Sequence, residues 1–158
     1  MMEQMGDSAW MTDSYPVSSN FLWDNSSTTV VPVVTIPKKW HEELDSQEAH
    51  ITVLDMFGNL LWVNEAWRQF GRMSGSNDPH YGIGTNYLDI CDRAHGHGSY
   101  EAGIVAGGIR QVIAGTYKSV YFRYGFECPD RRHLFAVRIT QRDDHGVMRL
   151  CVAHERIM

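Results

Sequence analysis

The sequence predicts an α+β domain, built as a five-stranded antiparallel sheet with short helices and one longer helix on one face. Three observations favour this class. Two short apolar strand candidates come first, a group of helix candidates follows, and three longer strand candidates close the chain. Short turns between neighbouring strands make antiparallel pairing the expected arrangement.

The composition fits one globular domain with some additional length. Of the 158 residues, 43% are hydrophobic and 21% are charged. The net charge of −5 opposes the positive surface that nucleic-acid binding requires. No apolar run approaches the roughly 18 residues of a membrane span, and Glu3 and Asp7 stand where a secretory signal would carry positive charge. Cys91, Cys128 and Cys151 show no paired spacing, which indicates reduced thiols. We therefore expect a cytoplasmic protein without nucleic-acid or membrane partners.

Residues 1–37 differ in composition from the rest of the chain. Ser, Thr and Asn, which favour turns and solvated backbone, are frequent there, so we expect this segment to be largely disordered or extended. Its interspersed aromatic residues leave open a second interpretation, in which it docks on the domain or on a partner. The domain itself is expected over residues 38–158. It begins with a short charged helix over 38–49, in which Trp40 and Leu44 share one face.

A β-hairpin and a capped helix come next. The apolar segments 51–55 and 60–63 are predicted strands, joined by a turn with a Gly-Asn pair at its tip. Asn64 is a favourable N-cap for the following helix, which is expected to stop near Gly71 or Gly75. A hairpin that leads directly into a helix is the expected start of the domain.

A loop and two more helices are predicted in the middle of the chain. Residues 74–84 are rich in Gly, Asn, Asp and Pro, which indicates a loop. Thr85 or Asn86 can cap a short helix over 87–91. After a turn rich in Gly and His, the clearest helix spans 100–114, because its apolar residues form one stripe.

Three strands are predicted to complete the sheet. Apolar and polar residues alternate over 117–126, 132–141 and 147–156. Turns at Pro129-Asp130 and at residues 143–146 separate these strands, so consecutive antiparallel hairpins are expected.

The chain resembles PAS domains over residues 46–157. The segment ITVLDMFGNLLWVNEAWRQFG is similar to their opening hairpin and first helix, with Val63-Asn64 at the end of the strand and Trp67 and Phe70 in the helix. GTNYLDICDRA resembles the Gly-x-Asn segment of their central helices, especially a bacterial sensory subgroup that reads GTNYLDVC. GIRQVIAGTYKSVYFRY resembles the long helix and the next strand, and FECPDRRHLFAVRIT and GVMRLCVAHERI resemble the last two strands.

The resemblance implies that the sheet curls around its helices and encloses the usual ligand site of PAS domains. A mostly apolar pocket with a few polar groups is also the general form of a small-molecule site. The alternative left open is that the same side chains fill a solid core. The expected lining residues are Tyr87, Leu88, Cys91, Ile109, Ile113, Phe122, Phe135, Val137 and Val152.

PAS domains can hold a flavin or a haem, so we compare the residues of this chain with those that hold each cofactor. Flavin photosensors of this fold place a reactive cysteine directly after the Asn of the Gly-x-Asn motif. Position 87 is Tyr, so covalent flavin photochemistry is not expected, whereas a non-covalent flavin stays open. Haem is the second candidate, because His95 and His97 lie near the place from which haem-binding PAS domains offer an axial ligand. Glycines flank both residues, which favours a polar turn instead. His133 and His154 fall in predicted strands, where ordinary packing or exposure explains them.

Neither a metal site nor a catalytic centre is predicted. Cys91, His95 and His97 are suitable ligand types, but the glycines at 96 and 98 argue against a helix that would bring them to one face. The sequence contains no nucleophile elbow, no phosphate-binding glycine loop with a lysine and no HExxH motif. The carboxylates fall in turns, caps and solvated faces. We therefore expect no enzymatic activity.

The resemblance implies a sensory module that binds a small ligand or cofactor in its core and passes on its state through dimer or partner contacts. A homodimer is expected, with the outer sheet face and the helix of Trp40 and Leu44 as contact surfaces, although these two side chains could equally cap the domain's own core. Such PAS domains usually run from Asp-Ile-Thr into a helix that leads to a histidine kinase or cyclase. Arg156-Ile157-Met158 stand at that place here. We therefore expect either that the effector is a separate protein or that this chain is a piece of a longer protein. A ligand-free interaction or dimerisation domain is the alternative function.

Overall fold

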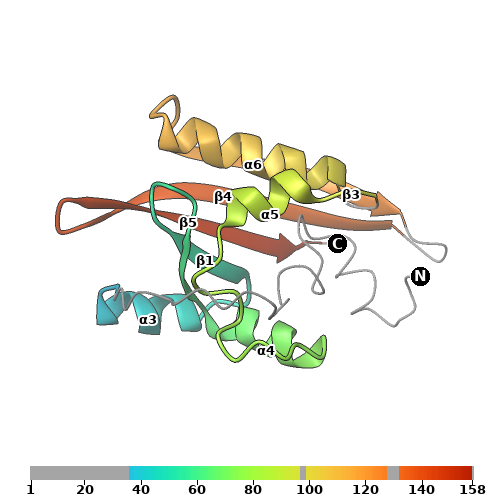
Figure 1. The fold of residues 1–158 in the computed structure, drawn as a ribbon, viewed down its shortest axis with the longest axis horizontal. Coiled ribbons are helices and arrows are strands. Elements are labelled where there is room, and N and C mark those ends of the chain that lie inside the picture. Colours follow the sequence, from blue (N-terminus) through green and yellow to red (C-terminus); the bar gives the residue numbers. More distant parts are fainter. Residues whose placement is uncertain (1–35, 97–98, 128–131, 158) are drawn as a thin grey trace.

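The computed structural model describes residues 36–96, 99–127 and 132–157, except for the side chains at 126, 127, 132 and 133. The elements follow one another in the predicted order (Figure 1). None of the described helices combines the length and the apolar character that crossing a bilayer requires. The helices are α3 (Lys38–Asp45), α4 (Glu65–Met73), α5 (Tyr87–Arg93) and α6 (Ser99–Ile113). The strands are β1 (His50–Leu54), β2 (Leu60–Val63), β3 (Ser119–Glu127), β4 (Arg132–Asp144) and β5 (Val147–Arg156).

The strands form one antiparallel sheet in the order β2-β1-β5-β4-β3. Strand β1 lies beside β5, so the first hairpin joins the sheet along the last strand of the chain. The β4–β5 turn is shorter than predicted, because His145 and Gly146 alone make it, with φ values of 52° and 90°. A two-residue turn with both φ values positive matches the twist of the flanking strands. The predicted five-stranded antiparallel sheet is confirmed.

One face of the sheet packs against α5 and α6 (Figure 1). Residues of β4 and β5 contribute every second side chain to this face, as the alternation predicted, and α4 adds Trp67 to the same cluster. Helix α6 approaches the sheet closely at Gly108, where an added Cβ would lie 2.9 Å from Cδ1 of Ile139. The main core of the domain therefore lies between these helices and the sheet.

Helix α3 covers the opposite face, which differs from the expectation that all helices share one side. Trp40 and Leu44 are 2% and 3% exposed and pack with Ile51, Val53 and Cys151. The physical reason is that both faces of β1 are buried: Ile51 and Val53 pack against α3, whereas Leu54 belongs to the main core on the other face. The helix also ends at Asp45, earlier than the predicted 38–49.

Several expectations fall on undescribed parts of the chain. The turn at Pro129-Asp130 lies outside the described residues, and so does nearly all of the segment 1–37. Ile36, near the end of that segment, is buried in the α3 cluster.

Candidate functional site

The expected pocket residues all come together on the face of the sheet that α5 and α6 cover. They belong to one apolar cluster or pack directly against it. Helices α5 and α6 supply five of them and strands β3 to β5 supply four. The nine residues are Tyr87, Leu88, Cys91, Ile109, Ile113, Phe122, Phe135, Val137 and Val152.

The start of α5 is fixed by Asn86. Its side chain accepts a hydrogen bond from the Asp89 amide at 2.9 Å, which makes Asn86 the N-cap. The same side chain donates to the carbonyl of Phe57 and to Oδ1 of Asn59, both at 2.9 Å. The amide of Tyr87 donates to the carbonyl of Gly58 at 2.8 Å. The tip of the β1–β2 hairpin thus sets where Tyr87 enters the core.

A buried polar pair lies within this apolar core. The hydroxyl of Tyr87 and Nε2 of His154 are 2.9 Å apart, and their ring centroids are separated by 6.5 Å. Both side chains are almost completely buried, at 0% and 1% exposed. Burial, followed by the charge of nearby His50, lowers the pKa of His154 from 6.5 to about 3. His154 is therefore a neutral hydrogen-bonding group in the core near neutral pH.

The buried position of His154 was not singled out in the sequence. Of the two explanations expected for it, packing and exposure, the structure shows packing, with the added feature of a hydrogen bond to Tyr87. The alternation of inward-facing and outward-facing residues along β5 would have predicted this position. Leu150 and Val152 face the core, so the next residue with the same parity, His154, must face it too.

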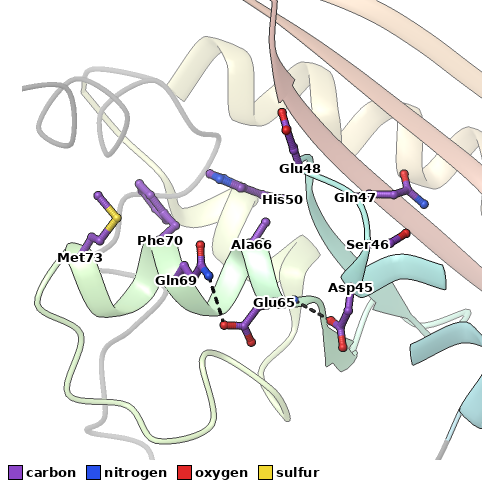
Figure 2. Close-up of a pocket in the computed structure, with 10 residues that line it drawn as sticks. All are labelled: Asp45, Ser46, Gln47, Glu48, His50, Glu65, Ala66, Gln69, Phe70 and Met73. Atoms are coloured by element: carbon purple, nitrogen blue, oxygen red, sulfur yellow. Dashed lines mark hydrogen bonds between the residues drawn. The ribbon is translucent and has the colours of Figure 1, made fainter. Parts of the chain in front are cut away.

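A second histidine extends this polar pair toward the surface. His50 lies directly opposite His154 in the β1–β5 ladder, and its ring stacks on Phe70 of α4 with centroids 5.2 Å apart. Burial lowers the pKa of His50 from 6.5 to about 4. His50 also lines a pocket between β1 and α4 (Figure 2). His50 thus lies at this pocket and, in the sheet, directly beside the residue that bonds to Tyr87.

Cys91 is a packing residue rather than a reactive thiol. It is 4% exposed within the cluster. Burial, assisted by the negative charge of Asp92, raises the pKa of the Cys91 thiol above its ordinary value. Since the thiolate is the nucleophilic and metal-binding form, Cys91 is unsuited to either role.

The histidines considered for haem or metal binding do not form such a site within the described residues. His95 is exposed on the turn after α5, outside the apolar cluster, whereas a haem iron in the core would need a ligand that faces inward. His97 lies outside the described part of the chain. Across residues 36–96, 99–127 and 132–157, no three His, Cys, Asp or Glu side chains are grouped so that they could hold a metal ion.

Trp40 and Leu44 lie on the far side of the sheet from this core. Their burial against β1 and β5 corresponds to the second role left open for them, that of capping the domain's own core. The guanidinium of Arg142 covers the outer side of Trp40, with its carbon 4.3 Å from the ring centroid, and it also pairs with Glu43. These side chains therefore offer little free surface in the described conformation.

Comparison with known proteins identifies the fold. No family model matches the chain. An uncharacterized 104.1 kDa protein from the hypE 3′ region of Rhodobacter capsulatus is 32% identical over 106 residues, and the match covers 63% of this chain but only 11% of that protein. The PAS domain of Bordetella pertussis BvgS superposes with a TM-score of 0.53 at 12% identity, covering 77% of this chain and 85% of that one. The VqmA dimer of Vibrio cholerae, a LuxR-type receptor, gives a TM-score of 0.52 at 14% identity, covering 78% of this chain and 52% of that one.

Proposed function

Because this chain has the PAS fold, we propose that it is a sensory module. Its helix-covered core would bind a small ligand or cofactor and relay the bound state through contacts with a second copy or a signalling partner. The observation that supports this most is the hydrogen-bonded Tyr87–His154 pair inside an otherwise apolar cluster. Apolar walls with a few convergent polar groups are the usual form of a small-molecule site.

The buried pair provides hydrogen-bonding groups that a ligand in the core could use. A neutral imidazole and a phenol can each donate and accept hydrogen bonds. A ligand that took over one of these bonds would compete with the contact between Tyr87 and His154, and so would change how α5 is held against β5. Ligand binding can shift a conformational equilibrium only by its different affinity for the two states. Here the difference would come from this exchange of hydrogen bonds.

Strand β5 provides a route for the signal. It pairs with β1 on one side and with β4 on the other, and its outward-facing Cys151 contacts the α3 cluster. A shift of His154 on the inner face would therefore reach α3 on the outer face through one strand. We infer that α3 and the outer sheet face transmit the state to a second copy. Trp40 and Leu44 would do so indirectly, by positioning α3.

The type of partner is inferred from the PAS fold. We infer a signalling effector such as a histidine kinase or cyclase, carried either by a separate protein or by a longer chain. The Rhodobacter capsulatus relative supports a modular arrangement, since the match occupies 11% of its length. A haem or non-covalent flavin would be one class of occupant, and a colourless metabolite another. We further infer that the module binds rather than catalyses.

An absorption spectrum combined with native mass spectrometry of the full chain tests the proposal. A flavin or Soret band, or a native mass above the chain mass by one small molecule, is the expected result. The Tyr87→Phe and His154→Gln variants should lower the bound fraction, while Tyr117→Phe, which alters an exposed tyrosine, should leave it unchanged. A colourless, ligand-free dimer in all four proteins would contradict ligand sensing and favour the interaction domain.

A further inference from the structure

A pocket on the surface lies outside the core, where the end of α3, the start of β1 and helix α4 meet (Figure 2). Its volume is about 420 Å³, within the range of pockets that hold small molecules. This pocket is separate from the core around Tyr87, and its occupation does not depend on the function proposed above.

The two walls of the pocket differ in character. Ala66, Phe70 and Met73 of α4 form an apolar wall, and Met73 is 76% exposed. His50 and Glu48 stand on the opposite wall, at and just before the start of β1 (Figure 2). The apolar wall suits the body of an organic molecule, and the polar wall suits a single charged group.

The charges around the pocket favour a cation. Three carboxylates line it, but two of them are already neutralised. Glu65 pairs with Arg68 and Arg72 at 2.9 and 2.7 Å, and these hydrogen bonds lower its pKa. Asp45 also pairs with Arg68, at 2.9 Å. Among the described residues no ion pair is formed by Glu48, so its negative charge remains available, and an anionic ligand would be repelled.

His50 adds no positive charge to offset Glu48. Burial keeps its imidazole neutral near neutral pH, since its pKa is lowered to about 4. The imidazole ring stacks on Phe70, so the aromatic surface is continuous across the two walls. A protonated amine near this surface would gain from the carboxylate of Glu48 and from the aromatic ring of Phe70.

We propose that this pocket binds a small organic cation, with an aromatic or branched apolar body against Phe70 and Met73 and a protonated amine at the carboxylate of Glu48. Because His50 lies opposite His154, which bonds to Tyr87, such a ligand would also contact the strand neighbour of this buried pair. The pocket is thus a second place at which a small molecule could influence the core.

A titration of the ¹⁵N-labelled full chain with 2-phenylethylamine, followed by NMR, tests the proposal. We expect saturable shifts of the amides at 47–50 and 65–73, with a dissociation constant on the order of 1 mM. Glu48→Gln should weaken binding roughly fivefold, and Phe70→Leu, which keeps apolar volume but removes the aromatic face, about threefold. Glu42→Gln is the matched control, because it removes the same charge from an exposed site on α3 outside the pocket, and should leave binding unchanged.

Phenylacetate distinguishes charge recognition from apolar adhesion, because it has a similar body and the opposite charge. We expect it to bind at least tenfold more weakly than the amine. Equal binding of the two compounds, equal effects of Glu48→Gln and Glu42→Gln, or the absence of saturable shifts in this region would each overturn the proposal. The unchanged amide spectrum of Glu48→Gln away from the pocket verifies that the variant is folded.

Discussion

Partly buried His50 and fully buried His154 lead to a quantitative prediction about stability and pH. Lowering the pH from about 7 to about 5 should destabilise the domain well before its carboxylates are protonated. His50 and His154 both have an ordinary pKa of 6.5, which burial lowers to about 4 and about 3 in the folded protein. Over this range the unfolded chain therefore takes up most of a proton on each of the two histidines, whereas the folded chain takes up almost none.

The direction and size of this pH effect follow from the difference in proton binding between the unfolded and folded states. Stability rises with increasing pH wherever the unfolded state binds more protons than the folded state. The stabilisation is fully present above pH 6.5 and is lost progressively as the pH falls through 6.5 toward the folded-state values. At about pH 5 each histidine should have cost about 2 kcal/mol relative to pH 7. Glu43 and Glu65, whose pKa values lie below 4.5, contribute only at lower pH.

Urea unfolding at a series of pH values, monitored by tryptophan fluorescence, measures this dependence. His50→Gln should remove about half of the loss between pH 7 and 5. His154→Gln should remove a similar part while it keeps a hydrogen-bonding partner for the hydroxyl of Tyr87. His80→Gln alters an exposed histidine and serves as the control, so its pH dependence should match that of the unmodified protein.

A flat stability profile between pH 7 and 5.5 would refute the reasoning, because it would mean that neither histidine is kept neutral by folding. The same conclusion would follow if His80→Gln changed the profile as much as His50→Gln. A steep profile that both buried-site variants leave unchanged would place the responsible groups elsewhere in the chain.

Three further predictions concern stability and are read out as free energies of unfolding at pH 7. Tyr87→Phe should cost about 1–2 kcal/mol because it removes a buried hydrogen bond, while Tyr117→Phe should be neutral; equal effects would contradict the importance of the pair. Asn64→Asp should cost at least about 2 kcal/mol, because it replaces an amide that donates to two carbonyls; a neutral result would count against this role. Gly107→Ala should stabilise the domain by about 0.5–1 kcal/mol, because Gly107 lies on α6 with open space around an added Cβ. Gly58→Ala should destabilise it, because Gly58 has φ +90° and an added Cβ would lie 2.9 Å from Leu88. Effects of the same sign would contradict the difference in backbone geometry between the two positions.

The helices were predictable largely because their starting signals are local. Asn64 and Asn86 are both confirmed as N-caps, since each accepts a hydrogen bond from the amide three residues ahead. A cap depends only on a short side chain and the turn that follows it. By contrast, Asn64 also accepts from the amide of Ile51 and donates to the carbonyls of Leu44 and Ala49. That wider role depends on long-range contacts, which the local pattern does not contain.

The chain order of helices and strands, the parity of the strand residues and the apolar stripe of α6 were determined by the sequence itself, because each depends on spacing along the chain. The tertiary structure alone decided that β1 is covered on both faces and that His50, His154 and Tyr87 are neighbours. Tyr87 and His154 are 67 positions apart and meet only because the hairpin tip positions α5 while β5 pairs with β1. Burial, which is a property of the assembled core, then keeps both imidazoles neutral.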